Sequence, residues 1–199
     1  MPHAMATFRT IAVTAVVTSA AWVMAGTMWL GRNHPTGGAP VAAGSGVPGA
    51  AQFAVGRLLI PVAGVRREAL VDTFSQARDG GARVHDAIDI LAPRGTPVIA
   101  AAAGRVEKLF LSKAGGNTVY IRAPDGVLLF YYAHLDAYAP GLVEGRQVAA
   151  GETLGTVGST GNADPAAPHL HFAVLQTSPH AKWYEPSTAL NPYPLLMRR

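Results

Sequence analysis

The chain has 199 residues, a net charge of +4 and a pI near 9.7. This length leaves room for one domain with a single core behind a separate N-terminal stretch. Because the chain contains no Cys, disulfides, thiolate metal ligands, a Cys nucleophile and a lipoprotein acylation site are excluded. Any metal must therefore be held by His and carboxylate side chains. The charge suits an anionic polymer as partner, but nucleic acid is not expected, because no basic-aromatic cluster accompanies it.

Residues 1–31 are predicted to be a transmembrane anchor. Ile11–Leu30 carries no charge, and about 20 apolar residues are needed to span a bilayer as a helix. A signal peptide cleaved near Val23–Ala25 is the alternative, and a buried helix is a third. The first two both carry the rest of the chain across the membrane. Residues 32–56 are rich in Gly, Ala and Pro and predict a flexible linker.

Residues 57–199 are expected to form one mainly β domain. Short apolar runs alternate with turn residues, and Asp125-Gly126 between two such runs predicts a hairpin. The fold class is therefore a compact antiparallel sheet or sandwich, with one N-terminal hydrophobic helix before it and little other helix. Trp183 and Tyr184 are expected to belong to a C-terminal segment that packs back on the domain.

Histidines that could bind a metal or transfer protons occur in three places. His85 and Asp89 are four residues apart, so in an extended segment both side chains point to one face. His169 and His171 share one face of a predicted strand, while Leu170 and Phe172 face the core. Two imidazoles side by side suit a metal or proton-transfer site.

His134 lies at the predicted end of an aromatic strand. Taken alone, it reads as a core or rim residue. The other histidines, His3, His34 and His180, lie before the apolar segment, in the linker and in a turn, where solvation explains them.

The combination points to a catalytic zinc site. Two His and one Asp give three protein ligands and leave a fourth tetrahedral position for water or substrate, whereas structural zinc sites are closed by four ligands. Such a zinc lowers the pKa of bound water and polarises a carbonyl. The two remaining histidines could move a proton and stabilise an oxyanion.

With these residues in hand, the region 71–176 resembles the lysostaphin-type (LytM-domain) zinc peptidases. The shared elements are His85…Asp89, then GTPVIAA (Gly95–Ala101), YAHL (Tyr132–Leu135), the stretch 143–162 and PHLHF (Pro168–Phe172). The order of these elements is the family's order, which makes the match specific.

The resemblance implies that His85, Asp89 and His171 bind Zn²⁺, and that His134 and His169 act beside it as the catalytic pair. It implies an antiparallel sheet with a metal-binding groove and the peptide stems of peptidoglycan as substrate. The enzyme would be a zinc metalloendopeptidase of the periplasm, anchored in the inner membrane or secreted. Cross-links between D-alanine and a diamino acid are the preferred bond. A protein partner is possible, and residues 51–79 are the expected place for an inhibitory cover.

This sequence departs from the family pattern at three places. Ala87 replaces the usual Gly, Asp72–Ser75 replaces a Phe-Gly opening, and Ala173 stands where Glu is common. Since no predicted ligand is missing, the alternative of a non-catalytic regulator that activates a partner amidase is disfavoured. A carrier domain is also disfavoured, because the related stretch 148–158 holds no Lys. A sugar-phosphotransferase domain is disfavoured because it is cytoplasmic, contrary to the predicted export of this chain.

Overall fold

A computed structural model describes residues 57–198. The predicted membrane segment (1–31) and linker (32–56) lie outside the described residues. Within residues 57–198, no helix combines the length and hydrophobicity that a membrane-spanning helix needs.

The described part of the chain is mainly β, as the sequence predicts. Its strands are β1 (Ala77–Arg78), β2 (Arg83–Val84), β3 (Ile88–Leu91), β4 (Pro97–Ile99), β5 (Gly104–Ser112), β6 (Gly116–Arg122), β7 (Leu128–Tyr138), β8 (Gln147–Val148), β9 (Thr153–Val157), β10 (His169–Gln176) and β11 (Thr188–Leu190). The helical elements are the 3-10 turns η1 (Arg67–Ala69) and η2 (Asp79–Gly81) and the α-helix α1 (Pro192–Met197).

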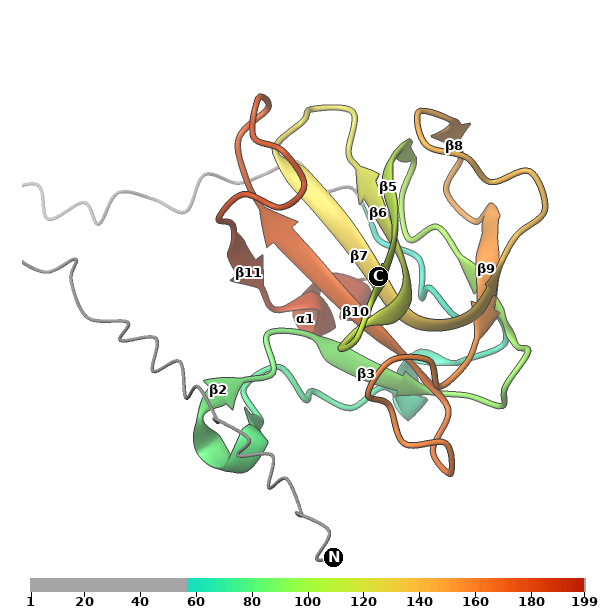
Figure 1. The fold of residues 1–199 in the computed structure, drawn as a ribbon, viewed down its shortest axis with the longest axis vertical. Helices are drawn as coiled ribbons and strands as arrows, with labels where there is room; N and C mark the ends of the chain where they lie inside the picture. The colour runs from blue at the N-terminus through green and yellow to red at the C-terminus, as the bar shows by residue number, and fades with distance from the viewer. Residues whose placement is uncertain (1–56, 199) are drawn as a thin grey trace, which may run out of the picture. The chain divides into compact units, whose positions relative to one another are not determined.

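One antiparallel sheet of nine strands organises the domain (Figure 1). Across it the strands follow the order β11, β10, β7, β6, β5, β8. β3 pairs with the N-terminal half of β10, and β9 pairs with the end of β7 and with β4. β1 and β2 form a separate two-stranded hairpin. The long strands β7 and β10 therefore lie side by side in the middle of the sheet and carry most of the predicted site residues.

Alternation along the strands decides which face of the sheet is buried. On β10 the side chains of Leu170, Phe172 and Val174 are fully buried, while His169 and His171 are partly exposed on the other face. This is the arrangement that a period of two predicts. The core also includes side chains from the other strands, from the segment before them and from α1. Its other large, fully buried side chains are Leu58, Ile88, Ile121, Leu128, Leu129, Phe130, Tyr132, Leu135, Leu154 and Leu196.

The Asp125-Gly126 hairpin forms as predicted and joins β6 to β7. Gly126 adopts a φ of +76°, a conformation that glycine takes without a Cβ penalty. The Asp125 side chain accepts a hydrogen bond from the Val127 amide at 3.0 Å. This local turn fixes the pairing register of β6 and β7.

The C-terminal segment packs back on the domain. The Trp183 ring lies 4.9 Å from the Phe110 ring and 5.1 Å from the Tyr120 ring, over β5 and β6. Further on, Asn191 caps α1 by accepting a hydrogen bond from the Tyr193 amide at 2.9 Å. Leu196 of this helix is fully buried, so the helix closes the core.

Candidate metal centre and active site

The pairing of β3 with β10 brings three predicted ligands together. Asp89 lies directly opposite His171 in this pair, and Asp89 Oδ1 is 3.2 Å from His171 Nδ1. His85 approaches from the segment before β3, with its Nε2 3.0 Å from Asp89 Oδ1 and 3.0 Å from His171 Nδ1. One donor atom from each residue therefore faces a common point.

These distances fit a zinc ion. Ligand atoms bound tetrahedrally at about 2.0–2.1 Å from zinc lie about 3.3 Å from one another. The three donor atoms are 3.0 to 3.2 Å apart and form a group that could hold a metal. Two imidazoles and one carboxylate are also a donor set typical of zinc, whereas calcium binds oxygen ligands. The residues present therefore fit the ion that the sequence predicts.

Asp86 lets His85 and Asp89 converge. The extended path predicted for this stretch is right for Asp89, which lies in β3, but wrong for His85, which precedes the strand. Asp86 adopts a left-handed φ of +59°, which turns the chain between the two ligands. Because the left-handed conformation is at Asp86, position 87 does not require the glycine that is usual in the family. The small side chain of Ala87 is fully buried.

Thr73 supports two ligands at once, although sequence reasoning did not select it. Its backbone carbonyl lies 3.0 Å from His85 Nδ1, and a carbonyl can only accept, so Nδ1 carries the proton and Nε2 keeps its lone pair. Its hydroxyl accepts a hydrogen bond from the Asp89 amide at 3.1 Å. Thr73 belongs to the stretch that replaces the Phe-Gly opening of the family, and it hydrogen-bonds to two of the three predicted ligands.

We expect Thr73→Val to weaken the site without removing a ligand. The substitution keeps the carbonyl but leaves the partly buried Asp89 amide without its acceptor, which costs about 1 kcal/mol of unfolding free energy. Loss of such a supporting contact also lowers metal affinity about 10–100-fold. Urea unfolding and zinc titration against a chelator measure both effects. A variant with wild-type stability and affinity would contradict this role of Thr73.

A bulge in β7 aims His134 at the same place. The sequence predicts His134 at the strand's end, but β7 runs on to Tyr138. Asn117 pairs with Leu135 and Val119 with Tyr132, so two residues of β7 face one of β6. His134 has a φ of +62°, and such bulges re-aim side chains beside active sites.

His134 and His169 have the same hydrogen-bonding arrangement. His134 Nδ1 lies 2.8 Å from the Thr160 carbonyl, and His169 Nδ1 lies 2.8 Å from the Ala167 carbonyl. Each Nδ1 therefore carries the proton, which leaves the Nε2 lone pair free. The two rings lie 5.0 Å apart, and His169 Nε2 is 3.8 Å from Asp89 Oδ1. Both imidazoles thus stand beside the metal position.

The loop that carries Thr160 is held by close backbone contact. Gly161 has a φ of +76°, and a Cβ on it would collide with the carbonyl of Ala114 and the amide of Gly116. The Thr160 hydroxyl donates to the Leu135 carbonyl at 2.8 Å and accepts from the Asn117 amide at 3.0 Å. These contacts fix the carbonyl that orients His134.

The charges at the site suit metal binding at neutral pH. Burial alone would raise the pKa of Asp89, but the neighbouring imidazoles of His171 and His85 outweigh it and hold this pKa far below its usual range. Burial lowers the pKa of His134 to about 4 and also lowers the pKa of His171. Asp89 is therefore anionic while His134 and His171 are neutral, as a ligand set and a proton acceptor require.

We expect the metal-free protein to lose stability as the pH falls from about 6.5 to about 4. In this range the unfolded chain binds a proton at position 134 near the ordinary His pKa of about 6.5, whereas the folded protein does not. The stability that the neutral His134 contributes is thus fully present above the pKa of about 6.5 in the unfolded chain, and it is lost as the pH falls toward the folded pKa of about 4. Urea unfolding across this pH range should show a shallower dependence for His134→Gln. Equal slopes would contradict the depressed pKa.

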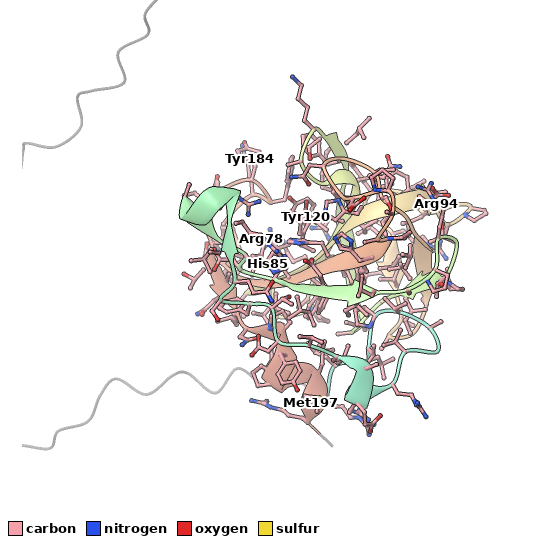
Figure 2. The ribbon with its side chains drawn as sticks, turned by 90° about the horizontal axis from the view of Figure 1, so that it is seen from below. Arg78, His85, Arg94, Tyr120, Tyr184 and Met197 are labelled. Carbon is pink, nitrogen blue, oxygen red and sulfur yellow. The ribbon has the colours of Figure 1, made fainter. Side chains whose placement is uncertain are left out.

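The site lies in an open groove with a volume of about 540 Å³. Arg78 and Arg83 of the β1–β2 hairpin line one wall, and the turn before β6 and residues 162–164 line others. Figure 2 shows Arg78 extending from this hairpin into the region of His85. Of residues 57–78 in the expected cover, Arg78 alone lines the groove. Leu58 and Val62 are buried in the core instead.

The structure brings all the predicted site residues to this groove, namely His85, Asp89, His134, His169 and His171. His180 is exposed and lies outside it. Ala173, at the position where Glu is common in the family, pairs with Tyr131 of β7 and is 4% exposed. Sequence reasoning missed the supporting residues Thr73 and Thr160, because their carbonyl and hydroxyl groups meet their partners only between segments that are distant along the chain.

Known proteins match this chain in both sequence and structure. Residues 83–183, just over half of the chain, match the family described as Peptidase family M23. The L-Ala–D-Glu endopeptidase of Bacillus subtilis (strain 168) is 34% identical over 62% of this chain and 38% of its own length. Peptidoglycan DD-endopeptidase ShyC of Vibrio cholerae is 38% identical over 51% of this chain and 22% of its own. This chain thus spans well under half the length of these curated relatives.

A solved structure shows the same fold. The catalytic domain of the antimicrobial peptidase lysostaphin from Staphylococcus simulans superposes with a TM-score of 0.55 at 32% sequence identity. The match covers 65% of this chain and 92% of that domain. This match confirms the predicted mainly antiparallel β fold of the domain. The chain therefore belongs to peptidase family M23.

Proposed function

We propose that this protein is a zinc metalloendopeptidase that hydrolyses peptide cross-links of peptidoglycan. The observation that carries the proposal is the meeting of three ligand atoms at one point, with two unligated imidazoles beside it in an open groove. A structural zinc site is closed by a fourth protein ligand, whereas a catalytic site keeps that position open.

In this proposal His85 Nε2, Asp89 Oδ1 and His171 Nδ1 hold the zinc. When bound, zinc lowers the pKa of a bound water to near 7 and polarises the scissile carbonyl. Asp89 contributes a single negative charge, so the loaded site keeps net positive charge, which favours the oxyanion of amide hydrolysis. Thr73 fixes the tautomer of His85 and thereby the atom that it presents.

His134 and His169 would handle the protons. Both present an Nε2 lone pair, because both Nδ1 atoms are committed to backbone carbonyls. Either Nε2 can take a proton from the attacking water and then return it to the leaving amine. The low pKa of His134, about 4, keeps its ring neutral and able to accept at pH 7. The shared geometry gives no preference between the two.

The names of the relatives and the charge of the groove support the proposed substrate. One relative is named an L-Ala–D-Glu endopeptidase and another a peptidoglycan DD-endopeptidase, so the relatives cut more than one bond. The arginines on one wall of the groove suit the carboxylates of peptidoglycan stem peptides. We also propose that the N-terminal segment directs the domain to the periplasmic side of the inner membrane, where this polymer lies.

Digestion of purified peptidoglycan tests the proposal. The full chain and an Asp89→Asn variant would be incubated with sacculi, and the released muropeptides identified by mass spectrometry. We expect the unmodified protein to open peptide cross-links and the variant to release none, and the product masses name the bond. Intact cross-links with zinc-loaded protein, together with stimulation of an added amidase, would support the regulator alternative instead.

A further inference from the structure

We propose that Arg78 is a positioning residue that holds Asp89 so that one carboxylate oxygen alone faces the metal. The inference rests on the proposed zinc site and adds a residue to it. Sequence reasoning did not select Arg78, which lies in β1, eleven residues before Asp89 along the chain.

The two oxygens of Asp89 have different partners. Oδ1 lies 3.0 Å from His85 Nε2 and 3.2 Å from His171 Nδ1, toward the metal position. Oδ2 instead accepts a hydrogen bond from Arg78 Nη2 at 2.6 Å. A charge-assisted bond of this length is among the stronger hydrogen bonds in proteins. It keeps Oδ2 away from the metal, because the same lone pairs cannot serve both partners well.

The hairpin that carries Arg78 is itself tied to the site. The His85 amide donates to the Gln76 carbonyl at 2.9 Å, and the Asp86 amide donates to the Phe74 carbonyl at 3.0 Å. Arg78 pairs with Arg83 across the hairpin. The side chain of Arg78 is 31% exposed and that of Asp89 is 21% exposed. The segment that is hydrogen-bonded to His85 thus also positions the Arg78 guanidinium against Asp89.

Two effects of Arg78 on zinc affinity oppose each other. Its positive charge repels the ion, but partial exposure screens that repulsion. Its hydrogen bond orients the carboxylate before the metal arrives, and partners of this kind are worth about 10–100-fold in metal affinity. Orientation is therefore the dominant effect.

The test compares Arg78→Met and Arg78→Lys in the full chain. Zinc affinity is measured by competition with a chromogenic chelator. We expect Arg78→Met to bind zinc about 10–100-fold more weakly, and Arg78→Lys to recover most of this loss, because an ammonium can donate to Oδ2. Arg94→Met is the matched control, since Arg94 pairs with Asp136 at the surface and should leave the affinity unchanged.

The visible absorption of cobalt(II) bound in place of zinc reports the coordination of the metal. A residue that only stabilises the fold would not change this absorption. Cobalt(II) absorbs visible light more strongly in four-coordinate than in five-coordinate sites. With Oδ2 released, Asp89 can bind through both oxygens, so the visible band of cobalt-loaded Arg78→Met should weaken and shift. Wild-type zinc affinity in Arg78→Met, or weaker affinity with an unchanged cobalt band, would overturn the proposal. If the unmodified protein binds no zinc at all, the proposed function fails instead.

Discussion

We expect the His171→Ala variant to fold but to contain no bound zinc and to show no measurable cleavage of peptidoglycan. His171 Nδ1 is one of three atoms around the metal position, and two remaining ligands hold zinc poorly. Loss of the metal removes several kcal/mol of transition-state stabilisation, which corresponds to at least about 10³-fold in rate. Metal analysis of the purified variant and muropeptide release measure the two effects.

His180→Ala is the matched control for this prediction. His180 is exposed and lies outside the groove, so its removal should change neither zinc content nor cleavage. The His171 ring is partly exposed, at 19% of its side-chain surface, and its replacement should not unfold the sheet. Full activity of a zinc-free His171→Ala protein would contradict the assigned role.

We expect His134→Ala and His169→Ala to keep zinc and still lose most activity. Neither side chain is among the three donors that meet at the metal position, whereas both present Nε2 beside it. General acid–base catalysis contributes about 10²–10⁴-fold, so kcat should fall by that factor in each variant. Zinc content and KM should stay close to those of the unmodified protein. Steady-state kinetics on a soluble cross-linked peptide separates kcat from KM.

The double variant distinguishes a shared proton path from independent roles. If both imidazoles serve one path, removing the second should cost little beyond the first, because residues that act as a unit are not additive. A product of the two single losses would indicate separate tasks. Wild-type kcat in either single variant would remove that histidine from the catalytic pair.

Much of the fold could be predicted because its signals are local. On β10 the alternation of His169, Leu170, His171 and Phe172 gives the strand, its buried face and its exposed imidazoles. Asp125-Gly126 gives the turn before β7 through the conformational freedom of glycine. Neither inference needs knowledge of residues elsewhere in the chain.

The details of the site could not be predicted, because they depend on contacts between distant segments. The bulge at His134 forms where its amide donates to the Gly115 carbonyl at 2.8 Å, and nothing in the local sequence indicates it. The left-handed turn at Asp86 is hidden in a stretch whose alternation reads as an unbroken strand. Arg78 meets Asp89 only once the β1–β2 hairpin has folded against β3.

Zinc dependence of cleavage tests the central claim most directly. The full chain would be stripped of metal with a chelator, dialysed and supplied with increasing zinc, and muropeptide release would be followed at each addition. The account predicts no cleavage by the stripped protein and full recovery at one equivalent of zinc per chain. Cleavage that persists without zinc, or zinc-loaded protein that leaves every cross-link intact, would contradict it.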